Sequence, residues 1–230
     1  MRCASRGLAF RPPKVCSDVA AAERPVLAVL NYGIGNLHSA HKGFSHAGAD
    51  TRLTADPAEI LAADGVVLPG VGAFGPCMRA LGATGLDKVA LDVIAAGTPF
   101  FGICVGMQVL YRSSQEAPGV QGLGVFDGEV ALIPGEVKRP QMQWNMLQSV
   151  NDHPMFAGLG PNPWMYFVHS YAATSGPRVL ATCDYGADLV AAAADGNVWA
   201  CQFHPEKSGR TGLQILQNFV TATAQARDAR

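Results

Sequence analysis

Short, continuously apolar runs alternate with amphipathic segments in the first half of the chain, from residue 26 onward. Residues 26–30, 65–68 and 99–103 are typical of strands buried on both faces, and residues 51–54 are a shorter candidate. Helical spacing follows at 37–47, after Asp56-Pro57, and in a weaker stretch interrupted by Gly82 and Gly85. This alternation predicts an α/β fold with a mostly parallel central sheet and helices on both faces.

After residue 112 the pattern is more typical of antiparallel strands. Short runs separated by Gly, Pro and Asp are predicted to be strands at residues 125–132, 142–150, 164–169, 179–183 and 189–194. A strong strand at 198–204 and a helix at 212–225 close the chain. We therefore expect one domain over residues 26–230, in which antiparallel additions extend the parallel sheet.

Residues 1–25 differ from the rest of the chain. They hold Arg and Lys in excess over acids, a Pro-Pro pair and no apolar period. We expect an N-terminal extension that is disordered; a transit peptide is the alternative that this composition leaves open.

Composition narrows the class of protein. Of the 230 residues, 49% are hydrophobic and the net charge is -1, which offers no electrostatic basis for binding nucleic acid or a membrane surface. The six cysteines form no CxxC pair, which favours reduced thiols and a cytoplasmic location. His38 and His41 have metal-ligand spacing, but no third ligand accompanies them, so we expect neither a metal nor a cofactor.

One cysteine lies where an apolar run meets a predicted helix. Gly102-Ile103-Cys104-Val105-Gly106 fits the pattern G-x-nucleophile-x-G, in which the side chain sits on a tight strand-to-helix turn. Flanking glycines remove the Cβ atoms that would clash there, and the helix N-terminus favours a thiolate. On this motif alone, a buried structural cysteine is an equal alternative.

A cysteine nucleophile needs a base, and the base needs an orienting group. His204 ends the predicted strand 198–204, and Glu206 follows two residues later. With a strand's period of two, both side chains are expected on one face, where the carboxylate can hold the imidazole. His169 ends another predicted strand and is a second candidate to line a site. These residues predict a Cys104–His204–Glu206 triad.

The same chemistry needs donors for a developing oxyanion. The N–H of Val105, which follows the nucleophile, is one donor by the geometry of such a turn. The loop Pro69-Gly70-Val71-Gly72 leaves a neighbouring strand at the same edge of the sheet. Its glycines would let the backbone approach a substrate carbonyl, whereas a plain strand-ending turn is the alternative.

With these motifs assembled, residues 26–230 resemble the class I, triad-type glutamine amidotransferases. The resemblance is carried by GICVGMQ at 102–108 and HPE at 204–206. Within that family the chain is most similar to the glutaminase subunits of imidazole glycerol phosphate synthase. That similarity rests on YGIGNL at 32–37, LPGVGAFG at 68–75, WN at 144–145 and HPEKS at 204–208.

The resemblance implies an activity and a role for each matching residue. Cys104 would attack the side-chain amide of glutamine, with His204 as base and Glu206 orienting it, to release glutamate and ammonia. Gly72 and Val105 would bind the oxyanion. The residues that would hold the amino-acid head of glutamine are Gln108, Glu116, Ser170 and Tyr171.

The resemblance also implies a partner. Lys207 and Trp144 would lie at a heterodimer interface with a (β/α)₈-barrel cyclase, which receives ammonia through an internal channel. The pair would make imidazole glycerol phosphate and an aminoimidazole carboxamide ribonucleotide in histidine biosynthesis.

Three features depart from the family pattern. Asn31 stands where Asp is usual, Gln143 stands where Gly is usual, and residues 1–25 have no counterpart. None of the three touches the predicted triad. Two other activities remain open at this point: a glutaminase subunit of another synthase, such as the one that makes pyridoxal phosphate, and a stand-alone cysteine hydrolase.

Overall fold

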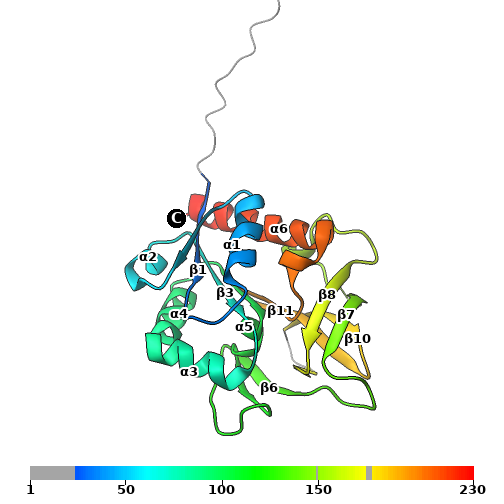
Figure 1. Cartoon of the computed structure of the whole chain (residues 1–230). Coiled ribbons are helices and arrows are strands. Elements are labelled where there is room, and N and C mark those ends of the chain that lie inside the picture. Colours follow the sequence, from blue (N-terminus) through cyan, green and yellow to red (C-terminus); the bar gives the residue numbers. More distant parts are fainter. Residues whose placement is uncertain (1–23, 149, 175–177) are drawn as a thin grey trace, which may run out of the picture.

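A single large sheet forms the centre of the molecule (Figure 1). The computed structural model describes residues 24–148, 150–174 and 178–230. The strand order is β10-β11-β12-β4-β3-β1-β2, in which β12 to β2 run parallel and β10 and β11 are antiparallel additions. The strands are β1 (Val26–Leu30), β2 (Asp50–Thr54), β3 (Gly65–Gly70), β4 (Phe100–Cys104), β10 (Val179–Asp184), β11 (Asp188–Asp195) and β12 (Val198–Cys201). The predicted α/β architecture is confirmed.

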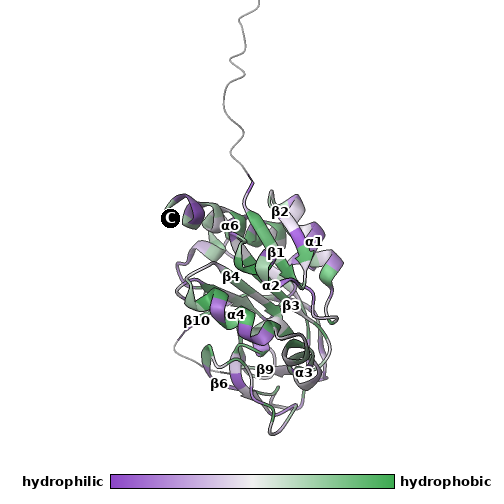
Figure 2. Ribbon diagram, turned by 90° about the vertical axis from the view of Figure 1, so that its left-hand side faces the viewer, coloured by the Kyte–Doolittle hydropathy of each residue, from purple (hydrophilic) through white to green (hydrophobic). Residues whose placement is uncertain are grey.

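Helices cover both faces of this sheet. They are α1 (Leu37–His46), α2 (Pro57–Leu61), α3 (Phe74–Thr84), α4 (Leu86–Ala95) and α6 (Gly209–Asp228). Helices α1 and α6 pack against each other, and α4 packs with α2 and α3. Figure 2 shows that the central strands are mostly hydrophobic, whereas the surrounding helices mix hydrophobic and hydrophilic residues. Between the sheet and α1 and α6, the rings of Phe44, Phe101, Trp199 and Phe219 pack edge to face or tilted.

Local sequence explains where these helices begin and end. Asp56 caps α2, because its carboxylate accepts a hydrogen bond from the N–H of Ala58 at 2.9 Å and Pro57 suits the first helical position. The weak helical stretch is interrupted at Gly85, which has φ 73° and separates α3 from α4. Gly82 lies inside α3 and does not interrupt it.

Two smaller sheets lie beside the carboxyl ends of the central strands. One contains β5 (Tyr111–Ser114), β6 (Phe126–Leu132) and β9 (Tyr171–Ala172); the other is the hairpin of β7 (Gln141–Met146) and β8 (Trp164–His169). A short 3-10 helix, η1, spans Pro154–Phe156. Strand β5 (YRSS) is too short and polar to have been predicted, and β9 is only two residues long. The strand expected at 142–150 ends at Met146.

Three further elements have boundaries that were not predicted, and the first two bear on the chemistry. The strand expected at 198–204 ends at Cys201, and a 3-10 helix, η2 (Pro205–Lys207), follows. The helix after Cys104, α5, spans only Val105–Gln108. The closing helix is longer than expected, since α6 starts at Gly209 and ends at Asp228.

Residues 1–23 lie outside the described residues, so the expected extension at 1–25 stays a prediction. Within the described ranges, no helix is both long and apolar enough to cross a membrane. Nor do those ranges contain a group of three or more His, Cys, Asp or Glu side chains placed to hold a metal ion.

Candidate active site

Cys104 lies at the sharp turn where β4 becomes α5. Its φ of 57° and ψ of -113° make it the one non-glycine residue with positive φ in the part of the chain that the structure describes. Such a conformation costs on the order of 1–3 kcal/mol and persists only where the surroundings enforce it. The turn aims the thiol out of the sheet edge, as the G-x-nucleophile-x-G pattern predicts.

Glycines enforce this turn because the backbone around it is packed too closely for a side chain. A Cβ on Gly106 would lie 1.9 Å from the carbonyl oxygen of Leu68, and one on Gly102 would lie 2.8 Å from the carbonyl oxygen of Gly106. Gly70, which pairs with Cys104 in the β3–β4 register, would bring a Cβ within 2.6 Å of the Gly106 nitrogen. The turn is therefore held from three sides by backbone.

His204 and Glu206 meet behind the cysteine. His204 Nδ1 lies 2.9 Å from Glu206 Oε1, and both side chains are buried. The two side chains were expected to share a strand face, and that reason is wrong because β12 has already ended at Cys201. Instead, η2 turns the chain back so that Glu206 reaches the imidazole. Ser208 fixes this turn, since its hydroxyl donates to the carbonyl oxygen of His204 at 2.6 Å.

The charges of this cluster favour an imidazolium. Burial lowers the pKa of His204, but hydrogen bonds to Cys104 and Glu206, together with their negative charges, raise the pKa well above its usual value. Because Nδ1 faces Glu206, the hydrogen bond between His204 and the Cys104 sulfur uses the other ring nitrogen, Nε2. Elsewhere burial raises the pKa of Cys77 and Cys201, and that of Cys183 to about 12, so these thiols stay neutral. The arrangement suits a thiolate–imidazolium pair at Cys104.

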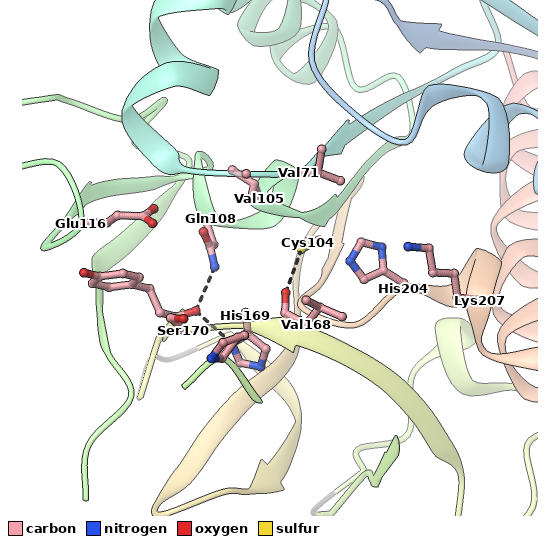
Figure 3. Close-up of a pocket in the computed structure, with 13 residues that line it drawn as sticks. Val71, Cys104, Val105, Gln108, Glu116, Val168, His169, Ser170, His204 and Lys207 are labelled. Carbon is pink, nitrogen blue, oxygen red and sulfur yellow. Dashed lines mark hydrogen bonds between the residues drawn. The ribbon is translucent and has the colours of Figure 1, made fainter. Parts of the chain in front are cut away.

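A cavity of about 390 Å³ opens at this pair (Figure 3). Nine predicted site residues line it: Gly72, Cys104, Val105, Gln108, Glu116, Ser170, Tyr171, His204 and Lys207. Val71, Pro140, Val168 and His169 complete the lining. In Figure 3, Gln108 and Glu116 lie on one side of Cys104, and His204 and Lys207 lie on the other. The cavity therefore has a polar and acidic end, the predicted nucleophile at its middle and a cation near its far side.

Hydrogen bonds fix the side chains at the acidic end. The Nε2 group of Gln108 donates to the carbonyl oxygen of Tyr171 at 2.9 Å and to Oε1 of Gln202 at 3.0 Å, which leaves Gln108 Oε1 as an acceptor for a ligand. Glu116 Oε2 accepts from the N–H of Phe74 at 2.8 Å. Both groups are suited to a ligand that carries a positively charged amine.

His169 belongs to the lining, in line with its place at the end of a predicted strand. Its Nδ1 lies 2.9 Å from the carbonyl oxygen of Tyr171, which can only accept, so Nδ1 carries the proton. Burial lowers the pKa of His169 to about 4, and the ring is neutral at pH 7. It supports the backbone beside the cavity.

Two predicted residues do not line the cavity. Glu206 lies behind His204, as an orienting group should. Trp144 lies on β7 with 48% of its surface exposed. One residue that contacts Cys104, Gln202, was not predicted at all. A polar side chain within the otherwise apolar run VWACQFH was the signal that could have found it.

Comparison with known proteins adds to this geometry. The family model described as glutamine amidotransferase class-I matches residues 28–223. A protein of Methanosarcina mazei named imidazole glycerol phosphate synthase subunit HisH is 46% identical over 198 residues, which cover 84% of this chain and 97% of the relative. A protein of the same name from Synechococcus elongatus is 47% identical over 211 residues, covering 89% and 97%.

Solved structures support the fold. A structure described as a glutamine amidotransferase has a TM-score of 0.69 at 20% identity and covers 86% of this chain and 98% of its own. The structure of PurLQS from Thermotoga maritima has a TM-score of 0.66 at 17% identity, covering 86% and 99%. At this identity the likeness concerns the fold alone.

Proposed function

The chain belongs to the class-I glutamine amidotransferase family, and we propose that its cavity hydrolyses glutamine with Cys104 as the nucleophile. Relatives at 46–48% identity, over most of this chain, make it the glutaminase subunit of imidazole glycerol phosphate synthase, an enzyme of histidine biosynthesis. The observation that carries the proposal for the site is the strained Cys104 turn beside the buried His204–Glu206 pair.

In the first half of the reaction, the Cys104 thiolate attacks the carboxamide carbon of glutamine. The N–H groups of Val105 and Gly72 stabilise the oxyanion that forms. The imidazolium of His204 then protonates the departing nitrogen, the carbon–nitrogen bond breaks, and ammonia leaves a γ-glutamyl thioester on Cys104. Glu206 keeps the imidazole oriented throughout.

In the second half, water attacks the thioester while His204 takes its proton. The carbon–sulfur bond breaks, glutamate leaves, and the thiolate–imidazolium pair is restored. The balance is glutamine plus water to glutamate plus ammonia, with no cofactor in the step.

The cavity also provides for the amino-acid head of glutamine. Its α-ammonium would contact Glu116 and Oε1 of Gln108, and the backbone at Ser170 and Tyr171 would hold the carboxylate end. This assignment is supported by the position of Glu116 and Gln108 on one side of Cys104, which lets the side chain of glutamine extend toward the sulfur (Figure 3).

A subunit of this enzyme works in a complex with a cyclase partner. We propose that the partner is a (β/α)₈ barrel that forms a heterodimer with this chain and receives ammonia through an internal channel. Lys207, exposed at the rim of the cavity, and Trp144, exposed on β7, are the proposed contacts. Since the reaction needs a reduced thiol, we place the complex in the cytoplasm.

The deciding experiment mixes the chain with the cyclase of imidazole glycerol phosphate synthase. Glutamate release is measured with and without the acceptor nucleotide. We expect little turnover by the isolated chain and a large increase in the full mixture. Strong turnover by the isolated chain would instead favour a stand-alone cysteine hydrolase, and activation by a different synthase would replace the assigned partner.

Two variants identify the nucleophile. Cys104→Ala should abolish glutamine use while the partner still makes product from added ammonia. Cys183→Ala, which removes another buried thiol from the same sheet, should retain glutamine use. The assignment of Cys104 fails if its variant still releases glutamate.

A further inference from the structure

The side-chain amide of Gln202 lies between the nucleophile and the substrate-binding end of the cavity. Gln202 directly follows β12 and is 1% exposed. Its Oε1 accepts from Nε2 of Gln108 at 3.0 Å, and its own Nε2 donates to Sγ of Cys104 at 3.8 Å. The amide therefore has a partner at each end, although it lies behind the cavity lining.

The direction of these hydrogen bonds is fixed by the backbone. The carbonyl oxygen of Tyr171 can only accept, so the amide nitrogen of Gln108 must face it. The same nitrogen then donates to Gln202, which must present its oxygen. The nitrogen of Gln202 is left to face Cys104, where a donor is favourable to a thiolate and an oxygen would be unfavourable.

The contact between Gln202 and Gln108 bears on how the cavity binds its ligand. With Nε2 of Gln108 held by Tyr171 and Gln202, Oε1 of Gln108 is the atom left to accept from a bound molecule. If Gln202 could not accept, the Gln108 amide would keep only one of its two anchors. A buried amide with both ends paired also resists rotation, because turning it would break two hydrogen bonds at once.

We propose that Gln202 is a positioning residue that stabilises the Cys104 thiolate with its amide nitrogen and holds Gln108 in its glutamine-binding orientation with its amide oxygen. The inference rests on the proposed function, because it assigns Gln202 a part in that same site. It makes the nucleophile and the substrate-binding side chain parts of one hydrogen-bonded chain: Tyr171, Gln108, Gln202, Cys104.

Two substitutions separate the two roles. Gln202→Glu keeps an oxygen for Gln108 but replaces the donor to Cys104 with a carboxylate. Gln202→Met fills a similar volume and removes both. The first should disturb only the thiolate, and the second should disturb the thiolate and the binding of glutamine.

The thiolate is followed by the pH dependence of alkylation of Cys104 by iodoacetamide, measured on the Cys104 peptide of the full chain. Gln202→Met should move the midpoint of this profile upward by about one pH unit because it loses the donor, and Gln202→Glu should move it further because it also turns an oxygen toward the sulfur. A purely structural role for Gln202 would lower the melting temperature and leave the midpoint unchanged.

The binding of glutamine is followed by KM in the complex with the cyclase. Gln202→Met should raise KM for glutamine by about tenfold, whereas Gln202→Glu should change KM little while kcat falls. Gln141→Met is the matched control. Gln141 is equally buried, but it lies on β7 beside Cys183, so its loss should leave the alkylation midpoint in place.

The inference is overturned if the Gln202 variants fold, as judged by melting temperature, and keep the alkylation midpoint of the wild type. It is also overturned if Gln141→Met shifts the midpoint as much as Gln202→Met does. Either result leaves the proposed function standing as long as Cys104→Ala abolishes glutamine use. Conversely, if the wild-type complex releases no glutamate, the proposed function fails and the alkylation profiles still test the Gln202–Cys104 contact.

Discussion

The two sides of the cavity are built from different kinds of structure. The catalytic wall, formed by Val71, Gly72, Cys104, Val105 and His204, comes from the ends of β3, β4 and β12, three parallel strands at the centre of the main sheet. The hairpin wall, formed by Val168, His169, Ser170 and Tyr171, comes from the end of β8 and the start of β9, outside that sheet.

In the proposed function, this difference separates the chemistry from the binding of the substrate. In the catalytic wall, backbone packs on backbone, with glycines at the contacts, so the nucleophile has one position. In the hairpin wall, position depends on side-chain hydrogen bonds to a carbonyl oxygen, from His169 and Gln108 to Tyr171. A wall held by backbone packing tolerates substitution poorly, whereas the hairpin wall responds to pH because it contains the titratable ring of His169.

The largest expected effect is on the chemistry of the catalytic wall. Glu206→Gln removes the charge that holds the His204 imidazolium, and kcat for glutamine should fall by about 10³-fold with little change in KM. Because Glu206 raises the pKa of His204, its loss should move the alkaline limb of the pH–kcat profile to lower pH. Steady-state kinetics of the complex across pH 6 to 10 measures both, and an unchanged alkaline limb would contradict the assigned pair.

Next in size is the effect of adding a side chain inside the Cys104 turn. Gly106→Ala would place a methyl group 1.9 Å from the Leu68 carbonyl oxygen, so β3 and α5 must separate. We expect the free energy of unfolding to fall by more than about 3 kcal/mol, as measured by urea denaturation. Gly160→Ala, where a Cβ meets nothing within 4 Å, is the control and should be nearly neutral. Equal losses in the two variants would mean that close backbone packing does not hold this wall.

Acid should destabilise the protein through the hairpin wall. The pKa of His169 is lowered to about 4 by burial, so the unfolded chain binds a proton between pH 6.5 and 4 that the folded protein excludes. The free energy of unfolding therefore falls as the pH drops from 6.5 through 4. The loss from His169 is up to about 3 kcal/mol, at 1.36 kcal/mol per pKa unit.

His169→Gln tests this directly. The amide can still donate to Tyr171 but has no proton to gain, so the slope of unfolding free energy against pH should flatten between pH 6.5 and 4. His38→Gln, on an exposed part of α1, should keep the wild-type slope. If His169→Gln also keeps the wild-type slope, protonation of His169 is not the cause of acid sensitivity.

The smallest effect concerns the loop after β3. The hydroxyl of Tyr32 donates to the Pro69 carbonyl oxygen at 2.7 Å, and the Cys77 thiol donates to that of Val71 at 3.5 Å. Tyr32→Phe should cost about 1 kcal/mol of stability and lower kcat by a few fold without changing KM, because the loop carries the proposed oxyanion donor Gly72. If KM alone changed, the loop would instead contribute to binding the amino-acid head of glutamine.

The catalytic wall was the more predictable of the two. Parallel strands buried on both faces leave continuous apolar runs, and the glycines around Cys104 mark a turn that few other residues permit. The contact between His204 and Glu206 was predicted correctly from a wrong premise, because a 3-10 turn brings two residues at this spacing together as a strand would.

Apart from His169, which its place at the end of a predicted strand had marked, the hairpin wall could be located only by resemblance. Ser170 and Tyr171 are proposed to act through the backbone, and β9 is two residues long, so no side-chain pattern marks them. Gln202 was missed for a different reason. A glutamine has no titration or metal chemistry to suggest a role. Its place within an apolar run marks it as unusual but does not predict its contacts with Gln108 and Cys104.

The positive φ of Cys104 has an evolutionary consequence. The backbone there would be more stable with glycine, the one residue that adopts such a conformation freely. A Cys104→Gly subunit should therefore unfold at a higher temperature than a Cys104→Ala subunit, although both lack the sulfur. Without selection for activity, random substitution would then replace Cys104 and leave a more stable but inactive protein. Only a continuing demand for ammonia keeps the thiol in place.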